Sequence, residues 1–343
     1  MKTLKIKGAL FTIVLIFASF LGGCGNNKEV TTDESNEKDT LTVFTTIFPL
    51  EDFTKKIGGE RVEVKSVYPP NVDAHSFEPT TKTMTQIADA DLFLYSGAGI
   101  EGFADKAVKS LKNAKVKIVK AAEGIELIES NHQHKHVDED GHGHDDGAAH
   151  EEEHSHDDGD AHDEDGHHHG DHDPHVWLDP IRSIELAENI KNALVEQMPN
   201  HKDEFEKNFE KLKGDLEVLD SKFADTVNSA KTKYILVSHA AYGYWQNRYG
   251  IEQISISGLS PTQEPSQKGL QNIIEESKKH DIHYVIFEQN LSAKVAEIIQ
   301  KEIGAGSLTL HNLEAVTDEN IKNKEDYFSI MEKNLETIKT ALN

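Results

Sequence analysis

Four residues of this sequence have side chains that can bind a metal, and they stand where the binding crevice of a parallel sheet is expected. Two of them directly follow the apolar runs 234–237 and 284–287, a third lies in the loop after the run 62–67, and the fourth ends a histidine-rich stretch. They are, in that order, His239, Glu288, His75 and His175. A single histidine near a strand end is usually a packing residue, but four such placements together favour a metal site. Three imidazoles and one carboxylate make a tetrahedral ligand set that suits Zn²⁺.

Four further histidines are expected to have ordinary structural roles. His201 stands at the start of a helical stretch, and His280 stands at the end of one, where its positive charge meets the helix dipole. His283 precedes its strand and so lies at the wrong end of it. His311 follows the run 307–310 and could face the same crevice, although we expect an ordinary strand-end histidine there.

Eight short apolar runs alternate with amphipathic stretches, which is the pattern of parallel sheets covered by helices. The predicted strands are 41–47, 62–67, 91–95, 116–119, 234–237, 253–256, 284–287 and 307–310. The predicted helices among them are 50–57, 84–90, 103–111, 242–249, 266–280, 293–303 and 326–342. Because the runs fall into two groups of four, the sequence predicts two small α/β lobes. The crevice of such sheets lies beyond the carboxyl ends of the strands, where the candidate ligands stand.

A long helical stretch separates the two groups of strands. Pro199 divides residues 181–229 into two predicted helices. In the second helix, apolar side chains recur at spacings of three and four and so share one face. They are Phe205, Phe209, Leu212, Leu216, Leu219 and Phe223. About 28 helical residues make a rod of roughly 40 Å, which could bridge the lobes, although a long surface helix is the plainer interpretation. The predicted organisation is an N-terminal lobe at 41–199, a linker helix at 200–231 and a C-terminal lobe at 232–343.

The histidine-rich segment, residues 132–172, differs from the rest of the chain. It contains 13 histidines, and 16 acidic residues but no Lys or Arg occur between positions 138 and 173. With few apolar side chains it cannot bury enough surface to fold by itself, so we expect a mobile loop. Its imidazoles could bind metal, but each site should be weak because a flexible chain loses conformational entropy on coordination.

The N-terminus has the features of an export signal. Lys2, Lys5 and Lys7 precede an apolar stretch at 9–20, which is too short to span a bilayer comfortably. The following Leu-Gly-Gly-Cys resembles a bacterial lipobox, which predicts a signal peptide at 1–23 and an acylated Cys24 that anchors the protein to the lipid bilayer. Because Cys24 is the only cysteine, it cannot form an intramolecular disulfide. Residues 24–40 are expected to be a flexible tether on the extracytoplasmic face of the membrane.

The net charge excludes some classes of partner. With 36 basic and 61 acidic residues, the chain has a formal charge of -25, which repels nucleic acids and favours cations. A metal site closed by four protein ligands leaves no position for an activated water, so we expect no enzymatic activity.

Several motifs of the chain resemble those of a known family. They are Asp73-Ala74-His75-Ser76-Phe77-Glu78-Pro79, the acidic histidine-rich insertion, His175-Val176-Trp177-Leu178-Asp179-Pro180, Ser238-His239-Ala240-Ala241-Tyr242-Gly243-Tyr244, Gly258-Leu259-Ser260-Pro261 and Phe287-Glu288. In these the chain resembles the metal-specific substrate-binding lipoproteins of bacterial ABC importers, most closely the zinc-specific ZnuA-type proteins.

The resemblance implies a function as well as a fold. It implies two α/β lobes joined by a long rigid helix, with Zn²⁺ held between them as the transported ligand and delivered to an ABC permease. It implies metal ligands at His75, His175, His239 and Glu288, in a protein that we expect to be monomeric. Manganese-type relatives have a second carboxylate in place of one histidine, so His239 indicates zinc.

Three other functions remain open at the level of sequence. In a zinc buffer or chaperone, the histidine-rich segment would be the functional part and the lobes its scaffold. A zinc-dependent hydrolase would use Glu288 as a general base and would need an open coordination position. A surface adhesin is supported only by the export signal.

Overall fold

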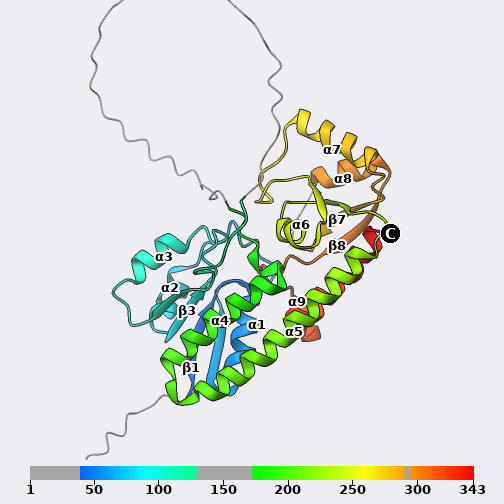
Figure 1. Ribbon diagram of the computed structural model, residues 1–343. Helices are drawn as coiled ribbons and strands as arrows, with labels where there is room; N and C mark the ends of the chain where they lie inside the picture. Colours follow the sequence, from blue (N-terminus) through cyan, green and yellow to red (C-terminus); the bar gives the residue numbers. More distant parts are fainter. Residues whose placement is uncertain (1–38, 130–171, 290–293) are drawn as a thin grey trace, which may run out of the picture. The chain divides into compact units, whose positions relative to one another are not determined.

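A computed structural model describes residues 39–129, 172–289 and 294–343 of the chain (Figure 1). The first half contains a four-stranded parallel sheet with the order β2-β1-β3-β4. Its strands are β1 (Leu41–Thr45), β2 (Val62–Ser66), β3 (Leu92–Tyr95) and β4 (Lys117–Lys120). The second half repeats this topology in the order β6-β5-β7-β8. Its strands are β5 (Tyr234–Val237), β6 (Glu252–Ser255), β7 (Tyr284–Glu288) and β8 (Gly306–Leu310).

Helices connect successive strands, as parallel pairing requires. The first half contains α1 (Phe48–Gly58), η1 (Gly59–Arg61), α2 (Thr81–Ala88) and α3 (Ala104–Leu111). The second contains α6 (Gly243–Tyr249), α7 (Gln267–Lys279), α8 (Lys294–Ile303), α9 (Asp318–Asn323) and α10 (Tyr327–Ala341). The predicted fold class, two parallel sheets flanked by helices, is confirmed. All eight predicted strands are present, and their ends agree with the prediction to within two residues. The short polar helix α9 was not predicted.

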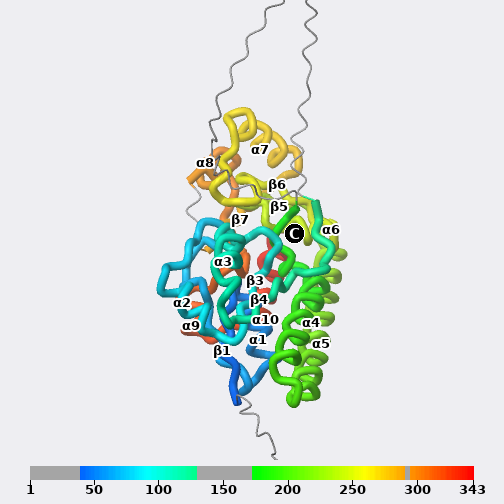
Figure 2. The backbone as a smooth tube through the Cα atoms, turned by 90° about the vertical axis from the view of Figure 1, so that its left-hand side faces the viewer, coloured from blue at the N-terminus to red at the C-terminus, as the bar shows by residue number. Residues whose placement is uncertain are grey.

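Two long helices join the halves. After η2 (Val176–Leu178), helix α4 (Pro180–Gln197) begins with Asp179 as its N-cap, and α5 (Lys202–Asn228) follows the short turn η3 (Pro199–His201). Helices α4 and α5 lie side by side (Figure 2). Helix α5 also contacts α1 of the first half and α6 and α10 of the second. It buries the predicted apolar stripe, from Phe205 to Phe223, together with Val227. No helix among the described residues is long and apolar enough to cross a membrane.

The apolar side chains form one large core and one small core. The large core continues from β1 through α4 and α5 to β5 and α10, and so includes residues from both sheets. The small core consists of five buried side chains between the second sheet and helices α7 and α8. They are Leu236, Ile256, Val285, Ala296 and Ile299. The continuous large core holds the carboxyl ends of both sets of strands in one packed unit.

Candidate metal centre

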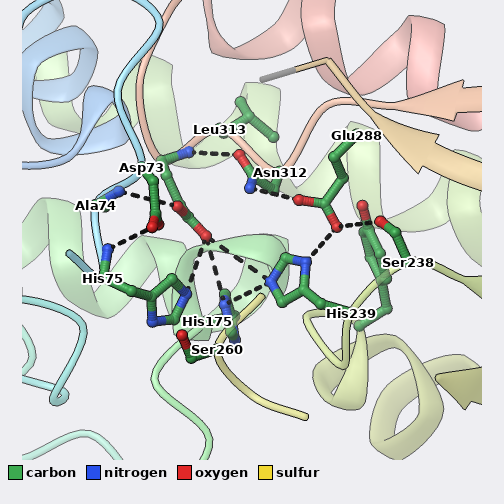
Figure 3. A network of polar contacts seen from close by, with 12 residues as sticks. Asp73, Ala74, His75, His175, Ser238, His239, Ser260, Glu288, Asn312 and Leu313 are labelled. Carbon is green, nitrogen blue, oxygen red and sulfur yellow. Dashed lines mark hydrogen bonds and ion pairs between the residues drawn. The ribbon is translucent and has the colours of Figure 1, made fainter. Parts of the chain in front are cut away.

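Three of the four predicted ligands lie together in the structure. The imidazoles of His75, His175 and His239 point toward one another (Figure 3), and their side chains are 1%, 0% and 0% exposed. The carboxylate that accompanies them is that of Glu314, whose side chain is 3% exposed. One ligand atom from each of these four residues lies within 4.8 Å of all the others. We refer to His75, His175, His239 and Glu314 as the four-residue cluster.

Most of the distances between the donor atoms of the cluster are close to those of a tetrahedral zinc shell. Oε1 of Glu314 lies 3.3 Å from Nε2 of His75, 3.6 Å from Nε2 of His175 and 3.9 Å from Nε2 of His239. The Nε2 atoms of His175 and His239 are 3.4 Å apart. Zinc bonds of about 2.0–2.1 Å in a tetrahedron separate neighbouring ligand atoms by about 3.3 Å. Four of the six separations between the donor atoms are therefore within about 0.6 Å of that value, and all six are within 4.8 Å.

The carboxylate beside the three histidines is not that of Glu288, which the sequence indicated as the fourth ligand. The carboxylate of Glu288 contacts Nδ1 of His239, whereas Nε2 of that ring faces the cluster. Glu288 therefore lies behind the ring (Figure 3). Glu288 is the last residue of β7, which pairs with β5, and its carboxylate oxygens are held there by Ser238 and Asn312.

Glu314 comes from the loop that follows β8. In this loop Leu313 has a φ of 60°, a left-handed conformation that is unusual for a large side chain and that turns the chain sharply before Glu314. The main-chain oxygen of Glu314 accepts a hydrogen bond from Phe48 N (3.1 Å), and its Oε2 accepts one from Ala74 N (3.4 Å). A lone carboxylate within the otherwise apolar stretch 313–316 was the available sequence signal.

Two aspartates orient the histidines from the first half of the chain. Asp73 accepts hydrogen bonds from His75 N (3.0 Å) and Ser76 Oγ (2.6 Å), which form a tight turn around His75. Asp173 accepts bonds through Oδ1 from both the backbone N (2.9 Å) and the ring Nδ1 (2.8 Å) of His175. Because Nδ1 of His175 is engaged in this way, its Nε2 is directed to the cluster.

His239 is the second residue after β5. Its Nδ1 meets Glu288, and Ser238 Oγ donates to the same carboxylate oxygen over 3.3 Å. A carboxylate on the rear nitrogen fixes the orientation and the tautomer of a metal-binding imidazole. In both His175 and His239, therefore, an acidic side chain contacts Nδ1, and Nε2 is available for the metal.

The charges of the cluster suit a cation. Burial alone would lower the pKa of His175, but the hydrogen bond and charge of Asp173, together with those of Glu314, raise it to about 9. Burial alone would raise the pKa of Glu314, but the imidazoles of His75, His175 and His239 hold it well below its usual value. Without metal, the carboxylate of Glu314 thus stays negative and His175 carries a proton. That proton supplies the positive charge that Zn²⁺ would supply when bound.

The other histidines considered from the sequence lie outside the cluster. His201 pairs with Glu204 (3.4 Å), His280 stacks on Tyr234, and His283 lies 3.5 Å from Asp281. His311 Nε2 lies 2.9 Å from Asn320 Oδ1, and its Nδ1 accepts a hydrogen bond from Leu313 N. Burial lowers the pKa of His311 to about 4, so this ring is neutral at physiological pH. These rings have structural roles, as expected.

Several predictions concern residues outside the described parts of the chain. Cys24, the signal peptide at 1–23 and almost all of the tether at 24–40 lie there. So does the histidine-rich segment except for His172, which forms an antiparallel bridge with Glu129. Asp173 N also donates to Ile128 O over 3.0 Å. The described residues on either side of 130–171 are therefore joined to each other within three residues of His175.

Two cavities reach the cluster from outside. One of about 390 Å³ is lined by His239, Asp73 and Glu264, and another of about 370 Å³ is lined by His75 and Glu78. Thr262 lines both cavities. Each of the two cavities therefore borders one buried histidine of the cluster, and Thr262 lies between them.

Several known proteins are similar to this chain. Residues 43–341 match the family model described as "Zinc-uptake complex component A periplasmic". The chain is 36% identical to the zinc-binding lipoprotein AdcA of Streptococcus pneumoniae, with 97% of this chain and 61% of that protein covered. It is 34% identical to the high-affinity zinc uptake system protein ZnuA of Bacillus subtilis, with 98% of each covered. The chain thus spans less than two thirds of the length of AdcA.

A solved structure resembles the fold as well as the sequence. The Zn(II)-bound ZnuA-like domain of Streptococcus pneumoniae AdcA superposes with a TM-score of 0.68 at 33% identity. The alignment covers 88% of this chain and 99% of that domain.

Proposed function

Because this chain belongs to the ZnuA family of zinc-uptake components, we propose that it captures Zn²⁺ outside the cytoplasm and delivers it to the permease of an ABC importer. The observation that carries the proposal is the buried four-residue cluster, in which three imidazole nitrogens and one carboxylate oxygen converge at zinc-like spacing. The relatives, a zinc-binding lipoprotein and a high-affinity zinc uptake protein, support the same cargo.

We propose His75, His175, His239 and Glu314 as the zinc ligands. Imidazole favours Zn²⁺, whereas carboxylate and water oxygens favour Mn²⁺ and Mg²⁺, so a set of three histidines and one glutamate selects for zinc among these ions. Two ligands come from each half of the chain. The ion would therefore link the loops after the first sheet to the loops after the second, and binding would stabilise the folded state.

The geometry supports transport rather than catalysis. Four protein ligands around a tetrahedral ion leave no coordination position for a reactive water. Glu288, the residue that a hydrolase would need as a general base, is engaged with His239, Ser238 and Asn312. What remains for such a site is to bind an ion tightly and to release it when its ligands separate.

Delivery requires the protein to stay near its permease. We propose that Cys24 carries lipid and holds the protein on the extracytoplasmic face of the membrane, with the chain up to residue 40 as a tether. Two or more acyl chains give stable membrane attachment, at about 0.8 kcal/mol per buried CH₂. The name of the relative AdcA, a lipoprotein, supports this proposal.

The proposed ligands are tested by chelator competition with the full chain. In the presence of a chelator that binds zinc more tightly than the histidine-rich segment does, only the tight site should retain zinc, at one ion per chain. His239→Ala and Glu314→Gln should each weaken that site by at least about a hundredfold, since each removes one of four ligands. His280→Ala, a histidine that stacks on Tyr234 outside the cluster, should leave the affinity unchanged. Unchanged affinity in His239→Ala would contradict the assignment.

A further inference from the structure

We propose that Glu288 and Asn312 form a positioning pair that orients the ligands His239 and Glu314 and links them to the segment that carries His175. The proposal rests on the proposed zinc site and concerns residues that do not themselves touch the ion. Glu288 and Asn312 are 5% and 6% exposed, so neither has a role at the surface.

Glu288 uses both carboxylate oxygens within the protein. Oε1 meets Nδ1 of His239 and accepts from Ser238 Oγ, and Oε2 accepts from Asn312 Nδ2 over 2.7 Å. A buried carboxylate is costly unless its oxygens are hydrogen-bonded, so these partners hold it in one orientation. The orientation of the carboxylate in turn fixes the plane of the His239 ring and directs its Nε2 to the cluster.

Asn312 connects three parts of the chain through three different groups. Its Nδ2 donates to Glu288, its Oδ1 accepts from the backbone N of Glu314 (3.1 Å), and its main-chain oxygen accepts from Trp177 Nε1 (2.8 Å). The bond to Glu314 N closes a turn over Leu313, whose left-handed backbone directs Glu314 toward the cluster. Asn312 thereby determines where the ligand oxygen lies.

The contact with Trp177 reaches the other half of the chain. Trp177 is fully buried, its ring centroid lies 5.4 Å from that of His175, and it lies two residues further along the chain. Three of the four ligands, His175, His239 and Glu314, are therefore connected through the single residue Asn312. Loss of the Asn312 side chain should disturb His239 and Glu314 directly, and it would reach His175 only by moving the main-chain oxygen that Trp177 contacts.

The experiment compares zinc affinity in three variants of the full chain. Glu288→Ala removes the support of His239 and should weaken zinc binding about a hundredfold, and Glu288→Gln, which keeps an acceptor oxygen and the same shape, about tenfold. Asn312→Leu removes the hydrogen bonds of the side chain at similar volume and should also weaken binding about tenfold. The graded loss from Gln to Ala distinguishes positioning from simple loss of charge.

Glu101→Gln is the matched control. Glu101 is also a buried carboxylate, in the loop between β3 and α3, where it accepts from Thr46 Oγ1 (2.6 Å), Ser96 N (2.6 Å) and Gly97 N (3.1 Å). It touches none of the four ligands, so its replacement should reduce the free energy of unfolding while the zinc affinity stays within twofold of wild type.

The visible absorption of the Co²⁺-loaded proteins distinguishes a change in ligand geometry from a loss of folding stability, because the intensity of this absorption depends on coordination geometry. The spectrum should change in Glu288→Gln, Glu288→Ala and Asn312→Leu and should remain that of wild type in Glu101→Gln. Wild-type affinity and spectrum in the Glu288 and Asn312 variants would overturn the positioning pair, as would an equal loss of affinity in Glu101→Gln. If wild type binds zinc tightly and His239→Ala does not, the proposed function stands whichever of these results is obtained.

Discussion

His175 lies between two acidic partners, Asp173 behind the ring and Glu314 in front of it. With a pKa raised to about 9, the ring is protonated at neutral pH when no metal is bound. Zinc must therefore displace a proton, so raising the pH toward 9 should favour capture and lowering it should favour release. The same proton contributes to the stability of the metal-free protein.

The stability of the metal-free protein should therefore depend on pH. The pKa of His175 is about 9 in the folded state and about 6.5 in an unfolded chain, so the stabilisation is fully present below pH 6.5 and is lost as the pH rises through 9. The metal-free protein should lose about 3 kcal/mol of unfolding free energy across this window. Denaturant titrations at pH 7, 8 and 9 measure it. Asp173→Asn, which removes the main charge that raises this pKa, should show a much smaller loss, and equal losses in the two proteins would contradict the prediction.

The histidines of the site could be predicted from sequence because each follows a strand or borders the connecting helices. The carboxylate could not be identified in the same way. Glu288 satisfies the strand-end rule and still lies behind His239, whereas Glu314 lies four residues beyond β8. Which oxygen reaches the ion depends on the left-handed backbone at Leu313 and on the side chain of Asn312. No periodicity in the sequence encodes either feature.

At the scale of elements, the strands were predictable because each is a short apolar run between polar turns. The ends of the helices depend on local caps, and α9 begins with a capping box at Thr317 and has six residues, too few to give a periodic pattern. The contact between α6 and the His175 segment was likewise not visible in the sequence. Tyr244 of α6 donates a hydrogen bond to Asp173 O over 2.9 Å, and the helix begins at Gly243.

Gly243→Ala tests this contact between elements. A Cβ at position 243 would overlap Oδ2 of Asp173 and press on Ile128, so Asp173 must move and its hold on His175 must loosen. We expect zinc affinity to fall about tenfold and the free energy of unfolding to fall by about 1–3 kcal/mol. Both quantities can be measured by zinc titration and denaturation.

Gly214→Ala is the control for that experiment. Gly214 lies within α5, and a Cβ there would meet nothing within 4 Å. Alanine should stabilise the helix by about 0.5–1 kcal/mol and leave zinc affinity unchanged. If Gly243→Ala also left both the zinc affinity and the stability unchanged, α6 would have no part in positioning His175.

At the scale of the whole molecule, the histidine-rich segment leaves and rejoins the described chain beside the metal centre. The bridge between Glu129 and His172 and the bond between Asp173 N and Ile128 O join its two ends. Its composition, 13 histidines with many carboxylates, indicates many weak sites and a raised local concentration of cations. We infer that it collects zinc for the nearby cluster without deciding which metal is retained.

Replacing residues 130–171 with a short Gly-Ser linker tests this inference. The bridged ends should tolerate the deletion, leaving one tight zinc site and removing several weaker ones. Stopped-flow transfer of zinc to a chelator should show an unchanged release rate from the tight site. Capture by the intact chain should weaken with added salt more than the tight site does, because the Debye length is only about 8 Å at physiological ionic strength. A clear change in the release rate of the tight site would instead make the segment a gate.

The position of zinc in crystals of the loaded protein tests the central claim most directly. Diffraction data collected on both sides of the zinc absorption edge locate the ion without reference to any assumed ligand. The account predicts one strong peak about 2.0–2.2 Å from Nε2 of His75, His175 and His239 and from a carboxylate oxygen of Glu314, with Glu288 still on Nδ1 of His239. A peak coordinated by Glu288 in place of Glu314, or no peak among the three histidines, would contradict it.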